Sequence, residues 1–378
     1  MDREELGHWL RLTLTPGIGP QSARKLLAAF GPPSEVFDQP QSALQQVVSA
    51  RQAQDLQLVP DTLPAQLERS WTWLQEGQEG TLRRRIVTLG DDAYPQTLLN
   101  ISDPPLMLYL MGAGQLDGPA VAVVGSRNPT PQGAANAREF ARALGLAGLT
   151  VVSGLALGVD AAAHEGALQS LQDRPGRLAT VAVVGTGLDR VYPQAHRDLA
   201  HRIARDGMLV SEYPLGTPPL AANFPRRNRI IAGLSQGTLV VEAALQSGSL
   251  ITARMALEQG REVFAIPGSI HSTQARGCHA LIKQGAKLVE SAQDVLEEMA
   301  LAPGNATEGL APAITQTRPQ SAQESLLQAL GHDPVGLDAL QARVGMSASE
   351  LQVGLMTLEL EGRLARLPGG LYQQLAAD

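Results

Sequence analysis

The sequence is poor in cysteine, in aromatic residues and in positive charge, and each shortage excludes a class of protein. A single cysteine among 378 residues excludes a disulfide framework and a zinc site built from cysteines. The formal net charge of −7 argues against a protein that holds nucleic acid through bulk positive charge. Only 3% of the residues are aromatic, so a broad base-stacking platform is not expected.

Long apolar runs are also missing. No stretch is long enough to cross a bilayer, and the first five residues carry three acids where a signal peptide would be basic and then apolar. We therefore expect a cytoplasmic protein with no membrane span. Cys278 lies beside His279, but the spacing fits no common ligand pattern, so a buried, inert thiol and no metal are expected.

The hydrophobic content of 44% is enough for a true core, and the length suggests two or three domains. Residues 81–301 alternate short, wholly apolar strands with amphipathic helices. The expected strands are Val121–Val124, Thr150–Val152, Ala179–Val184, Met208–Val210, Thr238–Val241 and Glu262–Ile266. Strands that are apolar throughout and separated by helices predict a parallel sheet covered on both faces.

The segments around this α/β core have different patterns. Residues 1–80 show helical periodicity and no strand pattern, which predicts a helical domain. Residues 302–322 are rich in Pro, Ala, Thr and Gln and are expected to be a linker. Residues 323–378 form their own small pattern of three helices and a hairpin, which predicts a winged helix.

The winged-helix prediction rests on local signals. The expected helices cover Glu324–Leu330, Leu337–Arg343 and a segment that Ser347 caps, with Glu350 completing a capping box. The expected hairpin strands, Arg363–Leu367 and Leu371–Gln374, flank a Pro-Gly-Gly turn.

The acidity is not spread evenly. Residues 1–80 and 320–378 each carry a net charge of −4, whereas residues 81–319 carry +1. A winged helix this acidic would repel phosphates, so we expect it to contact protein and not DNA.

Small and polar residues follow several of the expected strands, at the edge where parallel sheets bind ligands. They are Gly125, Ser126 and Arg127, then Ser153 and Gly154, then Ser247 and Gly248 at a helix start. One such turn is explained by chain geometry alone, but several on one edge predict a phosphate site. The dinucleotide fingerprint and the P-loop are both absent, so no nucleotide cofactor or ATP hydrolysis is expected.

Residues 223–229 concentrate the polar chemistry of the chain. Asn223, Phe224, Arg226, Arg227 and Asn228 combine guanidiniums and amides with one of only five phenylalanines. Guanidiniums bind phosphate oxygens, and an aromatic face stacks a base that only a single strand exposes. We expect phosphate contact from both Arg226 and Arg227. The alternative is that these arginines bind the protein's own carboxylates, which we expect of Arg229 beside them.

Two further features are interpreted as structural. Asp160 and His164 share a helix face, but no nucleophile accompanies them, so we expect them to lock the helix to a loop. Residues 16–20 resemble a helix-hairpin-helix turn, but its domain is acidic and Pro20 lacks an N–H donor.

Four runs carry a family resemblance. Residues 123–127, 152–164, 224–235 and 247–253 occur in order, and together they resemble the DNA-processing protein A family, also called DprA or Smf. The resemblance spans about residues 90–290. It implies an extended Rossmann-like domain, preceded by a helical domain and followed by a winged helix.

The resemblance also implies a function. Such a protein binds and protects incoming single-stranded DNA without catalysis, forms a homodimer through the Rossmann-like domain, and loads RecA recombinase in natural transformation or repair. By motif, residues 125–127 would hold a phosphate, residues 153–154 would complete that pocket, and Phe224, Arg226, Arg227 and Asn228 would line the path of the strand. The family pattern varies at the position of Arg226.

Two alternatives remain open. A nucleotide-cleaving phosphoribohydrolase is suggested by Gly237 and Thr238 followed by Glu242, although the glutamate comes one residue too late and no Pro-Gly-Gly precedes it. An interaction hub is suggested by the acidic winged helix, and is compatible with strand binding elsewhere. Deletion of residues 320–378 should then spare DNA binding.

Overall fold

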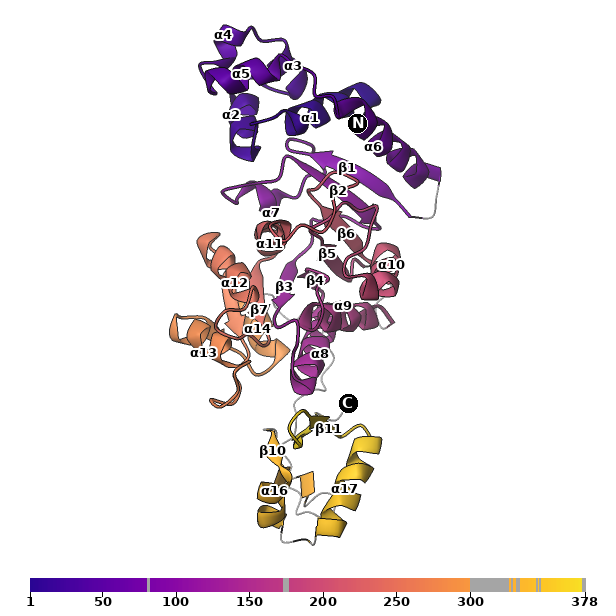
Figure 1. Ribbon diagram of the computed structural model, residues 1–378, viewed down its shortest axis with the longest axis vertical. Coiled ribbons are helices and arrows are strands. Elements are labelled where there is room, and N and C mark those ends of the chain that lie inside the picture. Colours follow the sequence, from indigo (N-terminus) through magenta and orange to yellow (C-terminus); the bar gives the residue numbers. More distant parts are fainter. Residues whose placement is uncertain are drawn as a thin grey trace.

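The computed structural model describes residues 1–79, 82–172, 177–299, 326–327, 329–330, 334–344, 346 and 348–375. Figure 1 shows three groups of elements along the long axis: helices at one end, a large sheet with its covering helices in the centre, and a small helix-and-hairpin unit at the other end.

The N-terminal helices follow from clear capping signals. The Asp2 side chain accepts from the Glu5 N–H at the start of the first helix, and Ser49 forms a capping box with Gln52. Leu6 and Leu10, one turn apart, are fully buried. The helices are α1 (Arg3–Leu14), α2 (Pro20–Phe30), α3 (Pro33–Phe37), α4 (Gln41–Leu44), α5 (Ala50–Leu56) and α6 (Leu63–Glu79). The predicted helical character of this region is confirmed.

The central sheet has nine strands in the order β1-β2-β6-β5-β4-β3-β7-β8-β9. The strands are β1 (Arg84–Thr88), β2 (Met107–Gly112), β3 (Ala120–Val124), β4 (Thr150–Ser153), β5 (Thr180–Val183), β6 (Met208–Ser211), β7 (Gly237–Val240), β8 (Glu262–Ala265) and β9 (Lys287–Leu288). All six expected strands are present, and β3 to β9 pair in parallel. Three strands were not predicted from the sequence: β1 and β2, which extend the sheet antiparallel at one edge, and the two-residue β9 at the other edge.

Helices cover both faces of the parallel strands. Val121 and Val123 of β3 pack on one side with helices α8 (Pro131–Ala147) and α9 (Val159–Gln169). Ala122 and Val124 pack on the other side, where α11 (Asn223–Gly233) and α12 (Ser249–Glu258) lie. This two-sided burial explains the wholly apolar strands. The elements between and after the strands are α7 (Gln96–Leu99), α8 (Pro131–Ala147), α9 (Val159–Gln169), η1 (Ser170–Gln172), η2 (Gln194–His196), α10 (Arg197–Asp206), α11 (Asn223–Gly233), α12 (Ser249–Glu258), α13 (Arg276–Lys283) and α14 (Ala292–Glu298).

One cluster of buried side chains runs from the N-terminal helices into the sheet. It joins Leu6 and Leu10 of α1 to Ile86 of β1 and Leu209 of β6. Trp73 of α6 packs edge-on against Tyr109 of β2, with ring centroids 6.0 Å apart. The helical region is therefore packed directly on the antiparallel edge of the sheet.

The C-terminal unit has a core of its own, built around Leu340, Leu355 and Leu364. Its elements are β10 (Val335–Gly336), α16 (Leu337–Val344), α17 (Ala348–Leu360), β11 (Leu364–Leu367) and β12 (Leu371–Gln374). The second and third expected helices and the hairpin are confirmed, with β10 as an extra strand beside β12. The expected linker 302–322, the cap Ser347 and part of the first expected helix lie outside the described residues.

Within the described parts of the chain, no helix is long and apolar enough to span a membrane. The same parts hold no group of three or more His, Cys, Asp or Glu that could bind a metal ion.

Candidate nucleic-acid interface

The candidate site lies where the sheet order reverses. Strand β3 has β4 on one side and β7 on the other, so the loops that follow β3 and β7 separate and leave a crevice. A cleft of about 750 Å³ occupies this place, and we call it the strand-end cleft. Its lining includes Gly125, Ser126, Arg127, Asn128, Ala156, Asp160, Tyr192, Phe224, Pro225, Arg227, Asn228, Ser247, Gly248, Ser249 and Thr252.

The loop after β3 brings an unpaired arginine to this cleft. Gly125 is required there, because a Cβ would lie 2.7 Å from Val159. The Ser126 N–H donates to the Glu242 carbonyl at 2.7 Å, and the Ser126 hydroxyl accepts from the Asn128 N–H at 3.1 Å. Arg127 between them is exposed, and its guanidinium makes no hydrogen bond or ion pair with the described residues. The loop thus fixes the backbone and leaves the cation free for a ligand.

A helix N-terminus forms a second wall of the strand-end cleft. Ser247 and Gly248 precede α12, and no side chain caps the helix from the Gly248 position. The Ser249 N–H donates to the Ser247 hydroxyl at 3.3 Å. The next two N–H groups, of Leu250 and Ile251, donate to the carbonyl oxygens of Ser247 and Gly248 at 3.1 Å. The start of α12 therefore turns the positive end of its helix dipole toward the cleft, which favours an anion.

An aromatic pair forms the third wall. Phe224, at the start of α11, lies against Tyr192, with ring centroids 5.4 Å apart and the rings tilted by 44°. Tyr192 is 48% exposed. Tyr192 was not among the predicted site residues, because it stands in an irregular loop far from 223–229 in sequence. A base could stack on the exposed part of this pair.

Arg227 differs from what the sequence predicts. It is only 4% exposed, and its guanidinium donates to the carbonyl oxygens of Gly154, at 2.6 Å, and Val183. Burial lowers the pKa of Arg227 to about 10, and the nearby Asp160 carboxylate partly offsets this. The Arg227 Nε donates to the Asn228 side-chain oxygen at 3.0 Å. Arg227 therefore lines the cleft from behind and contributes positive charge, while its donors serve groups of the protein itself.

Three other residues that were predicted to contact the ligand lie beneath the surface of the strand-end cleft. The Ser153 hydroxyl donates to the Val123 carbonyl at 2.7 Å, and the Gly154 N–H donates to Asp160 at 3.1 Å. The Asn223 amide donates to the Gly185 carbonyl at 3.0 Å. All three residues are buried and absent from the cleft lining. Their polar groups hold the loops in place. Direct contact of these three residues with a ligand stays a prediction.

Asp160 and His164 are buried as the structural interpretation predicts. Burial raises the pKa of Asp160, while the Arg227 charge and the N–H groups of Gly154 and Ala156 lower it. The His164 Nδ1 lies 2.7 Å from the Thr180 hydroxyl, and burial lowers its pKa to about 3. The imidazole is therefore neutral near pH 7.

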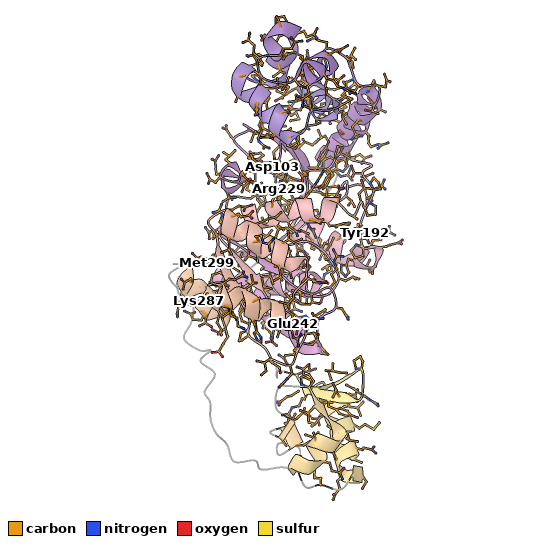
Figure 2. All side chains as sticks on the ribbon, turned by 60° about the vertical axis from the view of Figure 1, so that its left-hand side comes forward. Asp103, Tyr192, Arg229, Glu242, Lys287 and Met299 are labelled. Atoms are coloured by element: carbon orange, nitrogen blue, oxygen red, sulfur yellow. The ribbon has the colours of Figure 1, made fainter. Side chains whose placement is uncertain are left out.

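Arg226 and Arg229 point to a different groove. Arg229 binds Asp103 at 3.0 Å and Glu212 at 2.6 Å, which confirms that it binds the protein's own carboxylates. Figure 2 shows Asp103 and Arg229 next to one another. Arg24 of α2 also binds Asp103, at 2.5 Å. Arg226 is exposed and lines the groove of about 950 Å³ between α2 and α11, not the strand-end cleft.

Glu242 does not face the strand-end cleft. Its carboxylate accepts from the Thr130 N–H at 2.9 Å and from the Thr130 hydroxyl at 2.6 Å. Burial raises its pKa, and these hydrogen bonds partly lower it again. Figure 2 shows Glu242 well away from Tyr192, which marks the cleft. The carboxylate thus joins the residue that follows Val241 to Thr130, which caps the start of α8.

Cys278 is fully buried, as expected. Its Sγ lies 3.6 Å from the Val240 carbonyl oxygen and 3.7 Å from that of Val241. Burial raises the pKa of the thiol to about 12, so it is not a nucleophile near neutral pH.

The fold and the cleft together define a Rossmann-like protein whose sheet edge carries an exposed arginine, a helix N-terminus and an aromatic pair. Comparison with known families agrees with this description. Residues 85–300 match the family model of DNA recombination-mediator protein A, and residues 311–370 match that of the DprA winged helix domain. The chain belongs to the DNA recombination-mediator protein A family, as its sequence motifs imply.

Relatives extend the comparison over most of the chain. Protein Smf of Escherichia coli is 41% identical over 80% of this chain and 80% of its own. DNA processing protein DprA of Streptococcus pneumoniae is 51% identical over 55% of this chain and 72% of its own.

Two solved structures share the fold. The structure of DprA from Streptococcus pneumoniae has a TM-score of 0.64 at 38% identity, over 79% of this chain and 98% of that one. A structure of DNA processing protein A from Helicobacter pylori, described for its single-stranded DNA binding mode, has a TM-score of 0.50 at 30% identity, over 57% and 96%.

Proposed function

We propose that this recombination mediator binds single-stranded DNA in the strand-end cleft, without catalysing a reaction on it. The observation that carries the proposal is Arg127, an exposed guanidinium with no protein partner among the described residues, in the same cleft as the positive end of the α12 dipole. The exposed Tyr192 next to Phe224 offers a stacking surface. These groups fit phosphate and one or two bases, without a means of distinguishing sequence.

We propose further that the protein acts in the cytoplasm as a homodimer formed through the Rossmann-like body, and that it loads RecA recombinase onto the protected strand. Family membership supports this proposal. Sedimentation of the protein with and without RecA and oligo-dT tests it: we expect a dimer alone and a ternary complex in the mixture. A monomer that never associates with RecA contradicts it.

Strand binding is tested by titrating oligo-dT, duplex DNA and a mononucleotide at two salt concentrations. We expect the single strand to bind well above the duplex, with an affinity that falls steeply with salt. Arg127→Ala should lower oligo-dT affinity about tenfold and reduce the salt slope by about 0.7, the contribution of one phosphate contact. Arg202→Ala, which removes an exposed arginine of α10, is the matched control and should change neither value. Equal affinities for wild type and Arg127→Ala would show that the site is elsewhere.

The phosphoribohydrolase alternative depends on Glu242. Both carboxylate oxygens of this residue are occupied by Thr130, and the side chain does not line the strand-end cleft. This arrangement supports a non-catalytic function for the cleft. Incubation of the purified protein with nucleoside monophosphates should release no free base. Release of a free base that is lost on substitution of Glu242 would favour the phosphoribohydrolase.

A further inference from the structure

The winged helix carries an exposed apolar stripe on α17. Val353, Met356 and Leu360 are 68%, 65% and 80% exposed. Their spacing of three and four residues places them on one face of the helix. We call these three side chains the α17 stripe.

The opposite face of α17 already serves the core of the winged helix. Leu351, Leu355 and Leu358 are 0%, 2% and 0% exposed and belong to the buried cluster of this unit. A surface helix normally needs only one apolar face. The α17 stripe therefore contributes nothing to the winged-helix core and has the character of a contact surface.

Acidic residues flank the stripe. At 100° per residue, Glu350 and Glu359 stand on opposite sides of the face that carries Met356. Both are exposed. An apolar centre with negative rims repels phosphate and complements a partner with an apolar centre and positive rims.

Other occupants fit less well. A second copy of α17 would bring the Glu350 and Glu359 rims of the two copies together, and like charges across an interface repel. Helix α10 of this chain has the right charge pattern, with Arg197, Arg202 and Arg205, but its apolar side is buried in the Rossmann-like body through Leu199 and Ile203. Neither α17 of a second copy nor α10 of this chain therefore fits the stripe.

We propose that the α17 stripe docks an amphipathic helix of a partner protein, apolar along one face and flanked by lysine or arginine. Such a helix laid along α17 would bury Val353, Met356 and Leu360 and bring its basic side chains to Glu350 and Glu359. The proposal specifies the interaction surface of the acidic winged helix, and it is independent of strand binding in the cleft.

The test uses the full chain and a labelled synthetic helical peptide of leucine and lysine, with leucines spaced three and four apart. A peptide with glutamate in place of lysine is the charge control. We expect the wild type to bind the lysine peptide and not the glutamate peptide by fluorescence anisotropy. The variant Met356→Ser/Leu360→Ser should bind about tenfold more weakly or worse, and Glu359→Gln about twofold more weakly at low salt.

The control variant is Ile270→Ser, which removes a side chain that is 74% exposed in the Rossmann-like body. It should bind the lysine peptide like the wild type. Oligo-dT affinity and circular dichroism of Met356→Ser/Leu360→Ser should equal those of the wild type, which separates loss of docking from loss of folding or strand binding.

Three outcomes would overturn the proposal. The first is equal peptide affinity in wild type and Met356→Ser/Leu360→Ser, and the second is equal binding of the lysine and glutamate peptides. The third is a fall from dimer to monomer in sedimentation on Met356→Ser/Leu360→Ser, which would assign the stripe to a second copy of this chain.

Discussion

Replacement of Arg227 by methionine distinguishes a structural cation from a DNA ligand. The guanidinium donates to two buried carbonyls, of Gly154 and Val183, and each bond to a charged donor contributes ~1.5–3 kcal/mol. Loss of both costs ~3–6 kcal/mol, and burial of the methionine side chain returns ~1–2 kcal/mol. We therefore expect Arg227→Met to lower the free energy of unfolding by about 3 kcal/mol.

Urea unfolding, followed by the circular dichroism of the α/β body, measures this change. Arg226→Met is the neighbouring control, and because Arg226 is exposed its substitution should change stability by less than ~0.5 kcal/mol. Arg127→Ala should also leave stability unchanged while weakening oligo-dT binding. If Arg227→Met keeps wild-type stability and loses oligo-dT affinity as strongly as Arg127→Ala, then Arg227 is a strand ligand and not a structural cation.

Three other changes probe buried groups. The pKa of His164 is lowered in the folded protein, so unfolding takes up a proton below pH ~6.5. The free energy of unfolding should therefore fall by up to ~1.4 kcal/mol per pH unit as the pH drops from there towards 3. His164→Gln should flatten this dependence in urea titrations at pH 7 and 5. The Cys278 thiol should resist Ellman's reagent at pH 8 in the native protein and react fully in denaturant; rapid native reaction would contradict its burial. Gly133→Ala places a Cβ against the Glu242 carboxyl, so it should break the hydrogen bonds between Glu242 and Thr130. The adjoining loop should then shift and the affinity for oligo-dT should fall several-fold. An unchanged affinity would show that this contact does not position the loop.

The parallel strands could be predicted because burial on both faces leaves a direct mark on the sequence. β1 leaves no such mark, since it begins with two arginines and is only partly buried. The strand β2 is apolar throughout, but its antiparallel pairing with β6 depends on contacts distant in sequence.

The site was predictable as a location but not residue by residue. Arg226 and Arg227 are neighbours of the same type, yet one is exposed and the other is 4% exposed, because successive residues of a helix differ by 100° in direction. Which direction is inward depends on how α11 packs on the sheet. Tyr192 reaches Phe224 from a separate loop, and no local pattern records such a meeting.

The buried cluster that joins α1 and α6 to the sheet has a consequence for how this architecture can vary. Truncation of the chain near residue 80 would remove Trp73 from Tyr109 and expose the apolar side of β1 and β2. In the full chain, the helical region and the Rossmann-like body should therefore unfold together. The winged helix keeps its nine buried apolar side chains within its own described residues. It can therefore be exchanged or lost as a unit, whereas the N-terminal helices can change only together with the sheet edge that they cover.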